Sequence, residues 1–305
     1  MNRVIKKRLA IGLFLCSIAV AAVYVGVQRY AHYAAESSLN RLVETVPWLR
    51  DVTYGEMAVE IFSEGLRMTD VAVSVDTAAK PVRIDQIIVH SMDRNHAWPF
   101  RMHVELLGIQ FSPDQITQNG ALLQQLGYDA MTGRLETMYR YEHEGKTLIL
   151  ERLHIDVADA GSVTLSGRIG NVDLVELLSG RVGGATMAGR IGGMLIEQGR
   201  LRYADASLFE RVLRFLARAR GISTKAYRRL LVRNLSAHLT VDAPENVASV
   251  TAGLSAFVIQ PTHLVASVSP DRPVALFWLL WYRNFEKLVN LLNLQVTTAP
   301  LPGAS

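Results

Sequence analysis

The sequence has very little cysteine: Cys16 is its one cysteine in 305 residues. With a single thiol the chain cannot form an intramolecular disulfide, and a cysteine-rich metal site is excluded as well. Because Cys16 lies inside a long apolar run, it is not expected to serve as a catalytic nucleophile either. Cysteine chemistry is therefore not expected to contribute to function.

Catalytic and nucleotide-binding motifs are also missing. The sequence contains no HExxH zinc motif, no nucleophile elbow and no SxxK motif. A duplicated glycine stretch in residues 180–193 lacks the following Lys-Ser/Thr that a phosphate-binding loop requires. The nearest approach to a set of metal ligands is His90, Asp93, His96 and His103, which the strand pattern scatters over the surface. We predict no catalytic residue, no cofactor and no metal site, and hence a protein that is not an enzyme.

The excess of charge of one sign is small. Lys and Arg number 32 against 28 Asp and Glu, which gives a formal net charge of +4. Neither this balance nor any reading motif favours nucleic acid as a partner. Half of the residues are hydrophobic and a fifth are charged, so the composition predicts a folded chain with a core rather than a disordered one.

One long apolar run is present, at residues 9–27, and it follows Lys6, Lys7 and Arg8. As a helix it would extend about 28 Å, close to the thickness of a bilayer core. Because positive residues stay in the cytoplasm, we expect a single-pass inner-membrane protein with most of its chain in the periplasm. A signal peptide cleaved near Ala19–Ala21 is the alternative. Residues 30–50 are expected to continue as a stalk helix.

A strand pattern with an internal offset recurs along the next part of the chain. In LRMTDVAVSV (66–75) two apolar pairs are separated by Thr69 and Asp70, so simple alternation would turn the second pair outward. A β-bulge or bend at these two residues would return both pairs to one face. The same spacing recurs in VRIDQIIV (82–89), VELLGIQF (104–111) and LILERLHI (148–155). The repeat predicts bent antiparallel strands with one apolar face and one wetter face.

Two basic helices are expected after residue 207. Ser207 and Glu210 have the spacing of a capping box, Gly221 marks the end of the first helix, and Ser223 or Thr224 begins the second. Five arginines on this pair are predicted to contact anionic lipid or an acidic partner, with a solvated face as the alternative. They are Arg211, Arg214, Arg218, Arg228 and Arg229.

Toward the C-terminus, residues 245–260 are expected to form a helix that ends at Pro261. Residues 274–294 begin with an uninterrupted apolar run that is too short to span a bilayer. We expect this segment to be one buried helix, and an interfacial helix is the alternative.

Two resemblances can be identified. The apolar N-terminal run, the segment VTYGEMAVEIFSEGLRMTDVAVSV and the repeated bent strands resemble the membrane-anchored envelope proteins grouped as AsmA-like. That resemblance implies a role in lipid handling or outer-membrane assembly, although this chain is too short to bridge two membranes. The segments LRYADASLFERVLRFLARARG and LSAFVIQPTHLVASVSPDRPV resemble a family of uncharacterised bacterial exported proteins.

The sequence thus predicts an α+β fold: an N-terminal transmembrane helix, then a curved antiparallel sheet of bent repeat strands with packed helices. The expected function is non-catalytic lipid contact or scaffolding in envelope assembly, with the inner membrane, lipids or another envelope protein as partners. The alternatives are a protein-binding partner of a membrane complex and, more distantly, an exported hydrolase. The expected parts are a cytoplasmic stub and anchor (1–29), a stalk helix (30–50), a β-rich repeat domain (51–179), a glycine-rich linker (180–199) and an α+β C-terminal part with the basic helix pair (200–305).

Overall fold

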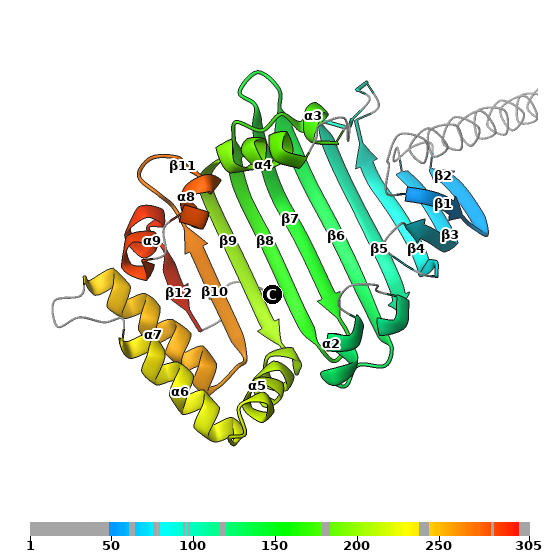
Figure 1. Ribbon diagram of the computed structural model, residues 1–305. Coiled ribbons are helices and arrows are strands. Elements are labelled where there is room, and N and C mark those ends of the chain that lie inside the picture. Colours follow the sequence, from blue (N-terminus) through cyan, green and yellow to red (C-terminus); the bar gives the residue numbers. More distant parts are fainter. Residues whose placement is uncertain are drawn as a thin grey trace, which may run out of the picture.

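The computed structural model describes residues 49–60, 65–75, 78, 80–93, 95–96, 98–115, 120–178, 184–237, 244–281 and 284–298. Among these residues, twelve strands form one antiparallel sheet in the order β1-β3-β4-β5-β6-β7-β8-β9-β10-β12 (Figure 1). In addition, β2 pairs with β3 and β11 pairs with β9. The strands are β1 (Leu49–Thr53), β2 (Glu56–Glu60), β3 (Gly65–Val75), β4 (Val82–Met92), β5 (Arg101–Phe111), β6 (Met131–Glu142), β7 (Thr147–Val157), β8 (Gly161–Gly170), β9 (Leu195–Asp205), β10 (His263–Val268), β11 (Val274–Ala275) and β12 (Gln295–Thr297).

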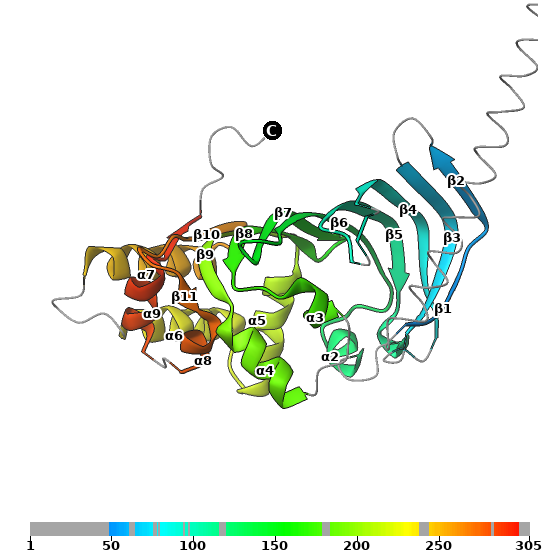
Figure 2. The ribbon, with the colours of Figure 1, turned by 90° about the horizontal axis from the view of Figure 1, so that it is seen from above.

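The helices lie along the two margins of this sheet and over its C-terminal strands. Figure 1 shows α3 and α4 at one set of strand ends and α2 and α5 at the other. Seen from above, α2 to α5 all lie on the same side of the sheet, and β3 to β5 turn out of the plane of β6 to β9 (Figure 2). The helices are η1 (Pro113–Gln115), α2 (Gly120–Gln125), α3 (Leu174–Leu178), α4 (Gly184–Gly193), α5 (Leu208–Ala219), α6 (Thr224–Ala237), α7 (Glu245–Ile259), α8 (Leu276–Trp281) and α9 (Phe285–Leu292).

The predicted fold class, an α+β fold that begins with a transmembrane helix, is wrong. One large antiparallel sheet dominates the structure, and helices cover its margins and one end. Within the residues given above, no helix has the length and apolar character needed to cross a membrane. The predicted transmembrane helix and the single-pass inner-membrane location therefore have no support in the structure. Residues 9–27, on which both predictions rest, lie outside the described residues.

The offset strands are bent at the predicted position. Asp70 has a positive φ of 52°, and the ladder between β3 and β4 passes from the Thr69–Gln86 pair to the Val71–Ile84 pair without including it. Met68 and Val71 are both buried, and Leu66 and Val73 pack in the same cluster at partial burial. The prediction that the four apolar residues share one face across the offset is confirmed.

Related irregularities occur in the other copies of the pattern. The ladder between β5 and β6 shifts register between Leu106 and Ile109, where Gly108 has a φ of 63°. The ladder between β7 and β8 shifts between Leu150 and Leu153. Because each irregularity absorbs the extra residue, the apolar side chains on both sides of it remain on one face of the sheet.

The two basic helices form, but α5 begins differently from the prediction. Ser207 makes no side-chain capping bond. Instead, Asp205 Oδ1 accepts a hydrogen bond of 2.8 Å from the backbone N of Phe209. At the other end Gly221 has a φ of 65°, as a helix stop requires, and Ser223 Oγ accepts from Ala226 N at 3.2 Å at the start of α6. The predicted capping box is therefore wrong, whereas the predicted stop and the second cap are confirmed.

The sheet also continues through the expected linker. Residues 180–199 contain α4 and the first part of β9, and β8 pairs with β9 from Gly161–Asp205 to Gly170–Leu195. The helix expected at 245–260 is present as α7.

Candidate functional site

The apolar face of the sheet is continuous from strand to strand. Two rows of directly paired side chains cross β6 to β9 on this face, Thr137-Leu153-Leu165-Leu201 and Leu135-Ile155-Val163-Tyr203. We define the central apolar patch as the aliphatic members of these rows: Leu135, Leu153, Ile155, Val163, Leu165 and Leu201. Ile155 is 38% exposed, and the other five are partly exposed. An apolar surface on a sheet that remains this accessible is available for a ligand.

Helices cover the same face on both sides of the patch. At one set of strand ends, Val212 and Phe215 of α5 pack against a buried cluster that includes Met131 and Ala160. At the opposite ends, Leu177 of α3 packs against a cluster built on Tyr141 and Val172. In Figure 1, which faces this side of the sheet, no described helix lies over the middle of β6 to β8. The patch therefore lies between two covered margins.

The opposite face of the same strands is polar and cross-linked by ion pairs. Glu136 is only 8% exposed, and its carboxylate lies 3.2 Å from His103 Nε2 and 3.3 Å from Arg152 Nη1. Arg134 pairs with Glu105 at 2.5 Å and lies 3.8 Å from Glu136. Burial alone would raise the pKa of Glu136, but the hydrogen bond with His103 and the charge of Arg152 hold it below its ordinary value. This network distinguishes a hydrophilic face from the apolar one.

Replacing Glu136 with glutamine should lower the free energy of unfolding by about 1 to 3 kcal/mol at pH 7, because a buried charge-assisted contact is lost. The pKa of Glu136 in the folded protein lies below its ordinary value of 4.5. Ionised Glu136 therefore stabilises the fold above about pH 4.5, and this stabilisation disappears as the pH falls through the folded-state pKa. Urea unfolding between pH 7 and pH 3 should show the difference between wild type and Glu136→Gln shrinking below about pH 4.5. A difference that stays constant over this range would contradict the assignment.

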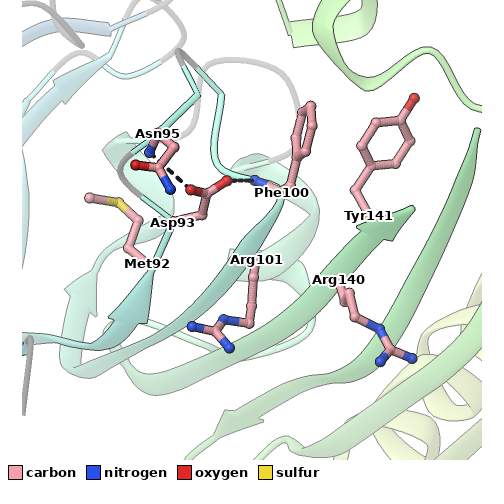
Figure 3. A pocket seen from close by; sticks show the side chains of 7 residues that line it. All are labelled: Met92, Asp93, Asn95, Phe100, Arg101, Arg140 and Tyr141. Carbon is pink, nitrogen blue, oxygen red and sulfur yellow. Dashed lines mark hydrogen bonds between the residues drawn. The ribbon is translucent and has the colours of Figure 1, made fainter. Parts of the chain in front are cut away.

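A cavity of about 600 Å³ opens where the loop after β4 meets β5 and β6 (Figure 3). Asp93 accepts hydrogen bonds there from the backbone N atoms of Asn95 at 2.9 Å and Phe100 at 3.2 Å, and its carboxylate lies 2.6 Å from His96 Nδ1. The hydrogen bond from Asn95 is the largest of the effects that lower the pKa of Asp93. Both carboxylate oxygens of Asp93 are thus bonded within the loop, and this side chain stabilises the conformation of the loop.

The arginines of this cavity point to the other side of the sheet. Figure 3 shows that the side chains of Arg101 and Arg140 point in the same direction, away from the rings of Phe100 and Tyr141. The two arginines are directly paired across β5 and β6. Like charges in directly paired positions repel each other. Arg140 also has a partner of opposite charge, because it forms an ion pair with Glu142 at 3.9 Å.

The five arginines predicted to bind lipid or a partner divide into two groups. Arg211 lies over the ring of Tyr128, 4.2 Å from its centroid, and donates to the carbonyl oxygens of Leu126 at 3.1 Å and Gly127 at 2.5 Å. Arg228 forms an ion pair with Glu210. Both side chains hold the helices in place. The other three, Arg214, Arg218 and Arg229, are exposed.

The C-terminal apolar segment differs from the prediction of one buried helix. It forms two helices, α8 and α9, and the second is capped by Asn284, whose side chain accepts from Lys287 N at 3.2 Å. The aromatic residues of α8 are exposed: Phe277 by 48%, Trp278 by 43% and Trp281 by 68%. The prediction of a buried helix is wrong for α8.

The histidines considered as metal ligands form two separate pairs of ring contacts. His90 and His103 stack with centroids 4.3 Å apart, whereas His96 stacks on Phe100 at 3.8 Å. In the part of the chain that the structure describes, no three histidine, cysteine or acidic side chains are grouped so that they could hold a metal ion.

Comparisons with known proteins find a similarity for only part of the chain. The comparison with curated proteins finds no match. A family model described as "Uncharacterized protein" matches residues 154–299. The matched segment begins within β7 and extends just past β12, so it includes four of the six residues of the central apolar patch and all of α5 to α9.

Proposed function

We propose that this protein binds lipid, with acyl chains on the central apolar patch. The observation that carries the proposal is an apolar sheet face that stays partly exposed between two helix-covered margins. A folded protein normally covers such a face with its own helices, as α7 and α9 do over β10 and β12. A ligand with long hydrocarbon chains is the kind of molecule that gains most from this surface.

The energetics favour a chain-like apolar ligand. Burial of methylene groups contributes about 0.8 kcal/mol for each group removed from water. The four strands that carry the patch, β6 to β9, extend over about 14 Å at a strand spacing of about 4.8 Å. An acyl chain lying across them would contact several rows of side chains at once. The polar network around Glu136 lies on the other face and would not contact it.

The test is a charge placed in the patch. Leu165 pairs with Leu153 and Leu201 in the middle of the face. Leu165→Asp should weaken binding of phosphatidylglycerol with a fluorescent acyl chain at least about tenfold, because a carboxylate is costly to bury beside a hydrocarbon chain. Binding is measured by titration of the full-length protein in dilute detergent, and thermal unfolding reports whether the variant folds.

Ser166→Asp is the matched control, because it introduces the same charge one residue further along β8, on the opposite face, where Ser166 pairs with Arg200. This variant should bind the lipid within about twofold of wild type. Ile155→Asp repeats the test at the most exposed member of the patch, where folding is least affected. Equal affinity for wild type and both patch variants would overturn the proposal and favour a protein partner.

A further inference from the structure

The connection between α5 and α6 is a short and well-defined tip. The backbone N of Gly221 donates to Arg218 O at 3.0 Å, and the N of Ile222 donates to Ala217 O at 3.1 Å. These two bonds and the positive φ of Gly221 form a Schellman motif, which ends α5 in a fixed geometry. The cap of α6 by Ser223 follows directly. In Figure 1 this tip lies beyond the ends of β9 and β10, at the lower edge of the molecule.

The tip exposes two aliphatic side chains. Leu216 and Ile222 are each 37% exposed. In a Schellman motif the residue in the position of Ile222 usually packs back on the last turn of the helix. Leu213 and Ala217 of the same helix are buried in a cluster with Tyr227 of α6. Leu216 and Ile222 thus stay partly exposed beside this buried cluster.

The two helices that meet at this tip carry positive charge that acidic residues do not balance. No acidic residue occurs between residues 211 and 237. Glu210, which precedes this stretch, is paired with Arg228. Six cations of the two helices are exposed, and none of the six has an ion pair within the described part of the chain. They are Arg214, Arg218, Arg220, Lys225, Arg229 and Arg233.

We propose that the α5–α6 tip docks on the surface of an anionic lipid bilayer. Ile222 and Leu216 enter the interfacial layer, and the exposed arginines contact lipid phosphates. Exposed aliphatic side chains on helices that carry exposed cations match a surface that has acyl chains beneath negatively charged headgroups. Guanidinium groups also bind phosphate with two parallel hydrogen bonds, which suits the predominance of arginine over lysine here. This inference rests on the tip alone and not on whether the sheet binds lipid.

The experiment places a fluorescent label on the tip. Because Cys16 is the one cysteine of the chain, a Cys16→Ser background with Ile222→Cys gives a unique site for a polarity-sensitive fluorophore. The full-length protein is mixed with vesicles of phosphatidylcholine alone, or with about one third phosphatidylglycerol, at low and high salt. Any contribution of other apolar segments is common to both kinds of vesicle. A label at Glu144→Cys, in the turn between β6 and β7 at the opposite ends of the strands, is the control.

We expect the label at residue 222 to become brighter and shift to the blue with vesicles that contain phosphatidylglycerol, and to respond weakly with phosphatidylcholine alone. Changing Arg214, Arg218 and Arg229 to glutamine should weaken binding about 100-fold at low salt, since each well-placed charge contributes about 1 kcal/mol, or about fivefold. The same titrations at about 0.5 M salt should differ much less, because screening shortens the range of the charges. The label at residue 144 should not respond.

The proposal is overturned if the label at residue 222 is silent with anionic vesicles, or if it responds equally to both vesicle compositions. It is also overturned if the triple glutamine variant binds like wild type at low salt. Arg211 and Arg228 are left unchanged because their bonds hold the fold. The triple variant should still bind fluorescent lipid in detergent like wild type, so failure here is distinguishable from failure of the proposal for the sheet.

Discussion

Replacing Gly108 with alanine is expected to lower the free energy of unfolding by about 2 to 4 kcal/mol, the sum of a backbone term and a steric term. The φ of Gly108 is +63°, a conformation that L residues rarely adopt. An added Cβ would also lie 2.0 Å from Asp85 Oδ2 and 2.8 Å from Asp85 Cβ. Rotation of the Asp85 side chain cannot relieve the second contact, and its carboxylate is held by Gln110 Nε2 at 2.8 Å.

Two other glycines separate these terms. Gly221 has a similar φ of +65° but no atom within 4 Å of an added Cβ, so Gly221→Ala should cost only about 1 to 2 kcal/mol. Gly189 in α4 has open space and no positive φ, and its replacement by alanine should be neutral or stabilise by up to about 1 kcal/mol. Urea unfolding followed by circular dichroism gives all three values. Equal losses for Gly108→Ala and Gly221→Ala would show that β4 moves aside without strain.

Replacing Leu213 with alanine should lower the free energy of unfolding by about 2 to 5 kcal/mol, the range for an aliphatic side chain removed from a closed core. Leu213 is 1% exposed and lies with Ala217 and Tyr227 between α5 and α6. Neighbouring helices can collapse only in part into the space of the missing side chain. The loss is measured by the same unfolding experiment as for Gly108.

Leu216 provides the control on the same helix. It is 37% exposed and carries the same side chain three residues further along. Leu216→Ala should therefore change the free energy of unfolding by less than about 1 kcal/mol. Similar losses at both positions would contradict the packing described for α5 and α6.

The local pattern of the strands was predictable from sequence, because a two-residue offset between apolar pairs has few physical solutions. The bend at Asp70 follows from keeping Met68 and Val71 on one face. The start of α5 was not predictable in detail. Ser207 and Asp205 both have side chains that can cap a helix, and only the tertiary structure shows that Ser207 Oγ instead donates to Asp159 O, in the turn between β7 and β8.

In the candidate site, too, the tertiary contacts of individual side chains could not be predicted from the sequence. Sequence spacing placed the five arginines on one basic helix pair, but Arg211 finds its acceptors at Leu126 and Gly127, about 85 positions away. Such long-range partners leave no periodic signal in the sequence. The exposure of Trp281 on α8 was also missed, because an apolar run of this length is compatible with a buried helix or an exposed one.

The order of the strands has a consequence for how a protein of this kind lengthens. From β3 to β10 every strand pairs with its neighbour in the chain. Duplication of one hairpin would therefore insert two new strands beside the original pair. The one ladder of that hairpin would become three ladders, and the pairing of the other strands would be kept. Each such event would widen the sheet by two strands, about 10 Å, and the new strands would bring their own apolar and polar faces. Tandem hairpin duplication is thus a direct evolutionary route from this sheet to one with a longer apolar face, with the covering helices left in place at its end.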